Sequence, residues 1–258
     1  MQLSRSSWYR EPSQQAARDQ PVIDALNAML KKYPRWGFWM CYDRLRLDGH
    51  AWNHKRVYRV YKAMKLNLPR RKKRQLPQRV QQPMVVEARA NAEWSLDFMS
   101  DALYHGRRFR TLNVLDEGVR EALDIVIDTS IPGARVVRML GRLIEWCGKP
   151  DAIRVDNGPE YISQVFSEWC EKHGIKLNYI QPGKPNQNAY IERLNRTYRH
   201  EVLNTDVFES LRQVREITRA WIIEYKQERP HDSLGKIPPA LFRRQAENPR
   251  TSTLELSH

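Results

Sequence analysis

The chain has 258 residues, a formal net charge of +14 at pH 7 and a mean hydropathy of −0.73. An apolar fraction of 41% with eight tryptophans predicts one large or two modest folded domains, and no apolar run approaches the roughly 20 residues of a membrane-spanning helix. No secretory signal is recognisable, and three cysteines outside any CxxC pattern argue against a disulfide framework or a zinc ribbon. We therefore expect a soluble protein of a reducing compartment.

The positive charge is concentrated in the first third of the chain. Residues 1–86 contain 19 Lys or Arg against five Asp or Glu, a net of +14, whereas residues 87–258 contain 25 of each sign. Between Gly49 and Val86 there are eleven basic residues and no acidic one. A basic module of this kind predicts a polyanionic partner.

Apolar residues at helical spacing predict three short helices in residues 1–66. The first ends at Pro34, the second runs from about Phe38 to Gly49, and the third follows an N-cap at Asn53. The third helix has an apolar side that includes Val57 and Tyr61, and an opposite side that presents Lys55, Arg59 and Lys62. This arrangement resembles a helix-turn-helix DNA reader; the alternative is an ordinary solvated helix. We favour DNA contact because no acidic residues alternate with these cations along the helix.

Residues 67–88 are predicted to be a linker. They combine three prolines and several glutamines with an uninterrupted cationic run, Arg70, Arg71, Lys72, Lys73 and Arg74. Such a run cannot bury itself and is attracted to phosphates without reading sequence.

After the linker, the pattern predicts three strands at 94–99, 109–115 and 122–127. A helix at about 136–147, a short strand at 152–155, a helix from Ser163 to His173, a strand at 176–180 and a long helix from Asn186 to Leu203 follow. The order is a three-stranded meander followed by alternating helical crossovers. The predicted fold class is α/β, a ribonuclease-H-like mixed sheet with flanking helices, preceded by a small all-α helix-turn-helix-like module.

Three acids stand where such a fold could gather them. Asp97 lies within the first strand, Asp156 follows a buried strand, and Glu192 lies on the long helix with 35 residues between it and Asp156. Carboxylates brought together repel one another, and oxygen-only ligands select Mg²⁺ or Mn²⁺. Two such ions can activate an attacking oxygen and stabilise the leaving oxygen at phosphorus.

The segments around these acids resemble those of insertion-sequence transposases whose catalytic core is similar to retroviral integrase, the DDE recombinases. They are Trp94-Ser-Leu-Asp97-Phe, Arg154-Val-Asp156-Asn-Gly-Pro-Glu160-Tyr and Gly183-Lys-Pro-Asn-Gln-Asn-Ala-Tyr-Ile-Glu192-Arg-Leu-Asn-Arg. The chain looks most like the downstream reading frame of the two-frame, frameshift-expressed group. It departs from that group in residues 36–41, which lack a usual pair of arginines, and at Lys226, where asparagine is common.

The resemblance implies cleavage of the 3′ end of an insertion element and transfer of that end to new DNA. Asp97, Asp156 and Glu192 would be catalytic and would hold two Mg²⁺ or Mn²⁺ ions. Asn195, Arg196 and Arg199 share the helical face of Glu192 and are expected to meet the DNA backbone. The partners implied are double-stranded DNA, further copies of the chain and an upstream-frame protein, in the bacterial cytoplasm. His231 either approaches the site or packs under the last helix, and we favour packing.

Three alternatives are weighed against this interpretation. A retroviral integrase would need a zinc site, but no CxxC follows His50 and His54. A ribonuclease of the same fold would not need the basic module. A non-catalytic DNA-binding regulator, or a partial transposase that requires the upstream frame, stays open. The expected domains are residues 1–66, helical and DNA-binding; 67–88, linker; 89–245, catalytic core; and 246–258, tail.

Overall fold

A computed structural model describes residues 15–68, 87–181 and 185–247. The chain divides into two compact units, residues 1–75 and 76–258, which are treated separately below. None of the helices in these described ranges combines the length and the apolar character that crossing a membrane requires. The expected cationic run at 70–74 lies outside the described residues.

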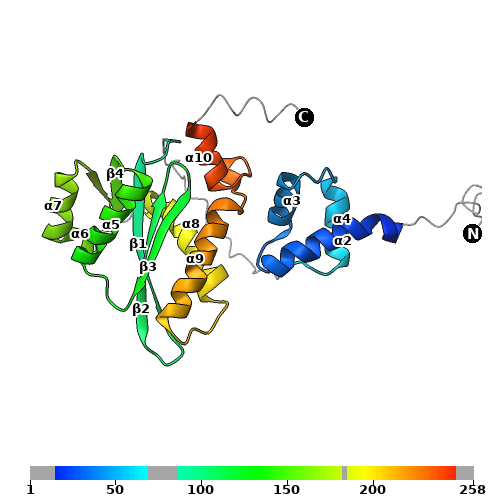
Figure 1. Cartoon of the computed structure of the whole chain (residues 1–258), viewed down its shortest axis with the longest axis horizontal. Coiled ribbons are helices and arrows are strands. Elements are labelled where there is room, and N and C mark those ends of the chain that lie inside the picture. Colours follow the sequence, from blue (N-terminus) through cyan, green and yellow to red (C-terminus); the bar gives the residue numbers. More distant parts are fainter. Residues whose placement is uncertain (1–14, 69–86, 182–184, 248–258) are drawn as a thin grey trace, which may run out of the picture. The chain divides into compact units, whose positions relative to one another are not determined.

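The described residues of the N-terminal unit form three helices, as the sequence predicts: α2 (Gln15–Lys32), α3 (Phe38–Leu47) and α4 (His54–Ala63) (Figure 1). Asn53 caps α4, because its side-chain oxygen accepts a hydrogen bond from the Lys55 backbone N–H at 2.8 Å. One side chain or more from each helix enters a shared apolar core, which includes Val22, Leu26, Cys41, Leu45, Val57, Val60 and Tyr61. This all-α unit has the predicted helix-turn-helix-like character.

A buried carboxylate from α2 neutralises part of the cationic side of α4. The Asp19 side chain is only 10% exposed, and it pairs with Arg59 at 2.8 Å and with Arg56 at 3.2 Å. No acid alternates with these cations along α4 itself, yet Arg59 is paired with an acid from α2. The sequence pattern missed Asp19 because it lies on a different helix, 40 residues earlier.

The second unit is built on a five-stranded mixed sheet in the order β3-β2-β1-β4-β5. Its strands are β1 (Glu93–Ala102), β2 (Arg108–Asp116), β3 (Glu121–Asp128), β4 (Ala152–Val155) and β5 (Lys176–Tyr179). The first three form an antiparallel meander, with a register shift between Val114 and Leu115, and β1, β4 and β5 are parallel. The ribonuclease-H-like topology expected from the sequence is confirmed.

Helices cover both faces of the sheet (Figure 1). On one face α5 (Gly133–Cys147), α6 (Pro159–Ile162) and α7 (Gln164–Lys172) enclose a core that includes Trp94, Leu96 and Ile153. On the other, α8 (Ala189–Tyr198) and α9 (Leu211–Gln227) pack on Phe109, Ile125 and Ile127. A 3₁₀ turn (Asp232–Leu234) and α10 (Pro239–Glu247) complete the described chain.

The helix predicted from Ser163 to His173 is confirmed as α7, the short helix α6 before it was not predicted, and the predicted long helix is subdivided. Ser163 has an extended backbone between α6 and α7; its hydroxyl donates to the Glu160 carbonyl, and its own carbonyl accepts from Phe166. The long helix opens with a 3₁₀ turn (Pro185–Asn188) and ends in a π-helix (Arg199–Leu203). That wider last turn lets Arg199 reach β1 while Val202 and Leu203 stay buried.

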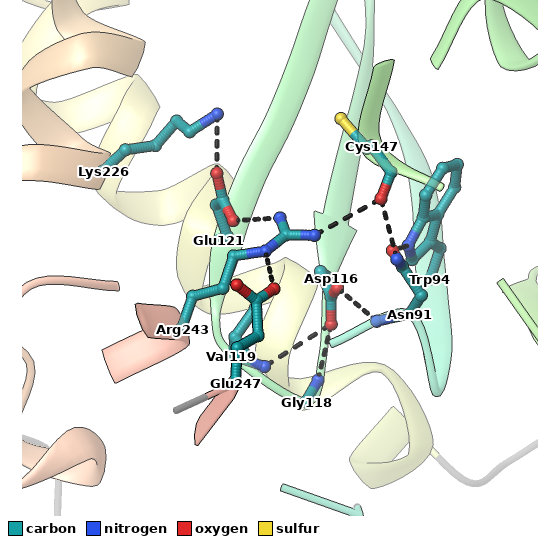
Figure 2. A network of polar contacts seen from close by, with 10 residues as sticks. All are labelled: Asn91, Trp94, Asp116, Gly118, Val119, Glu121, Cys147, Lys226, Arg243 and Glu247. Atoms are coloured by element: carbon teal, nitrogen blue, oxygen red, sulfur yellow. Dashed lines mark hydrogen bonds and ion pairs between the residues drawn. The ribbon is translucent and has the colours of Figure 1, made fainter. Parts of the chain in front are cut away.

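A polar network fastens the C-terminal helix to the sheet (Figure 2). Arg243 of α10 pairs with Glu121 at 2.7 Å and donates to the Cys147 carbonyl at 3.3 Å. The same carbonyl accepts from Asn91, whose side-chain oxygen accepts from the Trp94 indole at 3.0 Å. The network therefore links α10, the end of α5 and the beginning of β1.

Lys226 has a structural role in this network. Its ammonium lies 2.7 Å from Glu121, a residue that is 5% exposed, so two cations compensate one buried carboxylate. A buried charge is tolerated only when it is paired in this way. The lysine at this position, a departure from the transposase pattern, thus adds an ion pair on the side of the sheet that α9 covers.

We predict that Asp19→Asn lowers the stability of the N-terminal unit by about 1–2 kcal/mol, because Arg56 and Arg59 lose their shared partner. We expect no larger loss because the two arginine side chains are 36% and 48% exposed, so solvent screens their ion pairs with Asp19. Native-state hydrogen exchange of the amides in α4 measures it. Asp24→Asn, on the exposed side of α2, is the control and should leave that exchange unchanged; equal effects would contradict a specific role for Asp19.

Candidate active site

The strand register brings Asp97 and Asp156 to the same level of the sheet. β1 and β4 are parallel, with Ser95 paired to Arg154, and β4 ends at Val155. Two residues further along each chain stand Asp97 and Asp156, at the carboxyl end of β4. The Asp156 carboxylate accepts from the Gly158 N–H at 2.9 Å, which closes the turn that follows the strand. Neighbouring parallel strands therefore present two carboxylates at one edge.

Helix α8 adds the third acid. Ile191, Leu194 and Tyr198 are fully buried against the sheet, and the intervening Glu192 is exposed. One turn after Glu192, Asn195 donates a hydrogen bond from its amide to Asp97 at 2.6 Å. Because residues three apart on a helix lie on one side, this bond also fixes the helical face that carries Glu192 relative to β1.

The electrostatics of Asp97 respond to both other acids. Burial raises the pKa of the Asp97 carboxyl, the charges of Asp156 and Glu192 add to the rise, and the resulting pKa is about 6. Hydrogen bonds from the Phe98 N–H and from Asn195 act in the opposite direction and lower the pKa. Three negative charges that influence one another across a partly buried site form an arrangement that a bound cation would stabilise.

Cationic partners are missing at this site and abundant elsewhere in the unit. Glu117, Glu121, Asp128, Glu160 and Glu201 are each paired with at least one arginine. Within the described part of the chain, by contrast, none of the three acids forms an ion pair with Lys, Arg or His. Nor do any three His, Cys, Asp or Glu side chains there lie close enough together to hold a metal ion as they stand.

An arginine in β4 secures the strands beneath the site. Arg154 pairs with Glu117 at 2.7 Å and also with Glu93, and it donates to the Gln187 carbonyl at 3.2 Å. Burial raises the pKa of Glu117 to about 7, and the charge of Arg154 works against that rise. Gln187 lies in the 3₁₀ turn before α8, so Arg154 connects the β1–β4 pair to the element that carries Glu192.

Comparisons with known proteins identify both units. Residues 17–74 match an HTH-like domain, and residues 87–185 and 173–239 match Integrase core domain families. The chain is 42% identical over 235 residues to an insertion element IS476 protein of Xanthomonas euvesicatoria, covering 90% of this chain and 67% of that protein. It is 39% identical to an insertion element IS407 protein of Burkholderia multivorans, covering 81% and 75%. The chain belongs to the insertion-element transposases with an integrase core.

A solved structure supports the fold of this transposase. A chain of the simian T-cell lymphotropic virus intasome, in complex with a PP2A regulatory subunit, superposes with a TM-score of 0.54. It covers 84% of the transposase and 73% of the viral chain at 16% identity. At that identity the likeness concerns the fold alone, which is the ribonuclease-H-like architecture described above.

The residues predicted to contact DNA occupy different surroundings. Lys55, Lys62 and Arg196 are exposed. Asn195 is only 9% exposed, and its amide oxygen accepts from Asn113 at 2.5 Å while its nitrogen donates to Asp97. The structure therefore places Asn195 inside the transposase, in contact with the site, instead of on the surface that helical periodicity indicated.

Arg199 lies along β1 with its side chain 39% exposed. Its guanidinium pairs with Asp101 at 3.0 Å and donates to the Ser100 carbonyl at 3.0 Å, both in β1. His231 packs its ring edge against Tyr225 with centroids 4.8 Å apart, as expected, and burial lowers its pKa to about 3.

Sequence reasoning missed Asn113 and assigned no role to Arg154. Asn113 faces Asp97 directly across the β1–β2 pair and is fully buried. The signal was present, because Thr111 and Asn113 alternate with apolar residues in β2 and so predict one polar inner face. The partner of Asn113 on α8 is 82 residues away, and a local pattern does not identify such a contact.

We predict that Asp97→Asn stabilises the metal-free transposase by about 1–2 kcal/mol at about pH 7.5, because it removes a carboxylate charge that burial and two neighbouring acids disfavour. The folded-state pKa of about 6 lies above the usual 3.8, so the folded form of the wild type binds the proton more tightly. The contribution of the Asp97 carboxyl to the stability of the wild type is therefore fully present below about pH 4 and is lost as the pH rises through 6.

Chemical denaturation in EDTA, carried out at about pH 7.5 and at about pH 4, measures the difference in stability between Asp97→Asn and the wild type. The exposed Asp206→Asn variant is the control and should behave as the wild type. A loss of stability in Asp97→Asn at the higher pH would show that the surrounding hydrogen bonds already satisfy the charged carboxylate.

Proposed function

We propose that this chain is the catalytic subunit of a DNA transposase that cleaves the 3′ ends of an insertion element and transfers them to target DNA. The observation that carries the proposal is a group of three acids that have no cationic partner among the described residues, in a unit whose other buried carboxylates are mostly paired. Asp97 and Asp156 are aligned by the β1–β4 register, and the pKa of Asp97 responds to Asp156 and Glu192. Membership of the transposase family is consistent with this use of the three acids.

The donor set fits two Mg²⁺ or Mn²⁺ ions. It consists of carboxylate oxygens only, which are the ligands that these hard cations prefer. In the proposal Asp97, Asp156 and Glu192 hold the ions, which would supply activation of the attacking oxygen and stabilisation of the leaving oxygen. Asn195 orients Asp97 through its amide, and Arg154 keeps β1, β4 and the beginning of α8 together.

DNA is the proposed partner of both units. The N-terminal unit presents Lys55 and Lys62 from α4, the helix that a helix-turn-helix protein inserts into the major groove. On α8, Arg196 is exposed one turn after Glu192 and is positioned to meet a phosphate near the acids. Further copies of the chain and an upstream-frame protein are the additional partners that we propose for the assembled reaction.

We predict that Glu192→Gln abolishes nicking and strand joining of labelled oligonucleotides carrying the element ends, with a loss of at least about 100-fold. The substitution keeps the size of the side chain and removes the charge that the metal needs. The assay is run with Mg²⁺ and with Mn²⁺. Glu168→Gln, which neutralises an exposed glutamate on α7, is the matched control and should retain activity.

The outcome also separates the catalytic function from its rival. A folded wild type that binds DNA but forms no products would favour a non-catalytic regulator or a need for the upstream frame. Repeating the assay with the two frames fused then distinguishes these two. Products that persist in Glu192→Gln would overturn the assignment of this residue.

We further predict that Asn195→Ala and Arg196→Ala affect different steps. Asn195 is buried against Asp97, so its removal should reduce product formation while DNA affinity changes less than about twofold. Arg196→Ala should weaken DNA binding. It should also reduce the salt dependence of the DNA affinity by the amount expected for the loss of about one phosphate contact. Fluorescence anisotropy across a salt series measures binding, and gel assays measure products. A large drop in DNA affinity for Asn195→Ala would contradict the internal role.

A further inference from the structure

The exposed surface of α4 has two dissimilar sides. Toward α2, Arg56 and Arg59 are engaged by the buried Asp19 carboxylate. Toward α3, the surface carries His54, Lys55 and Tyr58, and no acidic side chain among the described residues pairs with Lys55. The positive charge that is available to a ligand therefore lies on the α3 side, at the beginning of α4.

An aromatic pocket opens on that same side. It has a volume of about 960 Å³, at the upper end of the roughly 300–1,000 Å³ of small-ligand sites. Its walls come from the start of α3, the start of α4 and the residues after α4: Gly37, Phe38, Trp39, His54, Lys55, Tyr58, Tyr61, Asn67 and Leu68. Trp39 is 57% exposed and Tyr58 43% exposed, so large rings face solvent in a unit that has a complete core without them.

None of Trp39, Tyr58 and Tyr61 stacks on Phe38, because each meets that ring edge-on. The ring centroid of Phe38 lies 4.8 Å from that of Tyr58 and 5.5 Å from that of Tyr61, and both contacts are edge-on. Trp39 and His54 lie 6.1 Å apart at 30°, wider than a direct stack. Aromatic faces beside a lysine are the combination that binds a nucleobase and its adjoining phosphate.

We propose that this pocket binds one unpaired DNA base, stacked on Trp39 and Tyr58, while Lys55 contacts the neighbouring phosphate. The proposal rests on DNA being the partner and adds which DNA feature is recognised. The basic charge of residues 1–86 supplies the complementarity to a nucleic acid. A thymine methyl group read in an intact major groove would fill little of a pocket of this size, whereas a base that has left the stack offers a complete ring.

The test compares three short duplexes of the same flanking sequence: fully paired, with one unpaired thymine, and with one unpaired abasic nucleotide. The full-length protein is titrated in EDTA with fluorescence anisotropy as the readout. We expect the wild type to prefer the unpaired thymine over both other duplexes by roughly 5- to 100-fold. The abasic duplex bends similarly but lacks the ring, so it separates base stacking from DNA flexibility.

Three variants locate the preference. Trp39→Ala should abolish it, Trp39→Phe should restore part of it because a stacking face returns, and Lys55→Gln should weaken binding to all three duplexes. Trp146→Ala is the matched control: Trp146 is 87% exposed on α5 and should leave the preference unchanged.

Other outcomes overturn the proposal. Equal wild-type affinity for the thymine and abasic duplexes would exclude a base pocket, and a uniform loss for all duplexes in Trp39→Ala would identify an ordinary duplex contact. A changed oligomeric state of Trp39→Ala, measured by light scattering, with unaltered DNA preference would assign the pocket to a protein partner. Because metal is absent, the result does not depend on catalysis; an inactive protein can still show the preference, and an active one can lack it.

Discussion

The ribonuclease-H-like unit depends on how it accommodates one carboxylate in its central strand. Asp97 lies on the sheet face that also carries Ser95, Arg154 and Asn113, so part of that face is polar although it is covered by α8. A buried charge costs several kcal/mol unless hydrogen bonds or opposite charges compensate it. Here two hydrogen bonds offset the cost only in part, because the pKa of Asp97 stays raised to about 6. The remainder is the energetic basis for attracting a cation.

This polar region divides the second face of the sheet into two halves with different stabilisation. Over β2 and β3, α9 and part of α8 bury a continuous apolar cluster that includes Phe109, Ile125 and Trp221. Over β1, β4 and β5, ion pairs and amide hydrogen bonds centred on Arg154 and Asn195 replace apolar contacts. Apolar contacts in the first half fix the orientation of α8 on the sheet. That orientation determines where the carboxylate of α8 lies relative to the carboxylates of the polar half. Substitutions in the apolar half are thus expected to act on the site through the position of the helix.

The sequence was informative where local patterns determine the outcome. Apolar runs predicted the meander, and the acid inside an apolar strand made Asp97 a candidate, because few structural reasons justify a charge there; the choice of the three acids came from the resemblance to the DDE recombinases. Once β4 is the parallel neighbour of β1, the register of these two strands places Asp156 beside Asp97. The contacts that support these acids were not predictable. Asn113 and Asn195 are 82 residues apart, and Asp19 and Arg59 are 40 residues apart, so each pair is created only by tertiary packing. For the same reason Asn195 was expected at the surface.

The charge balance of residues 87–258, with 25 basic and 25 acidic residues, conceals an uneven distribution of partners. Arginines from distant elements neutralise Glu117, Glu121 and Glu201. Consequently some cations are committed to structure, and among the described residues Asp97, Asp156 and Glu192 have no basic partner. In the N-terminal unit the reverse holds, since Asp19 occupies Arg56 and Arg59 and leaves Lys55 facing the aromatic pocket. In both units the charges left unpaired after folding, and not the total charge, mark where a ligand of opposite sign gains most by binding.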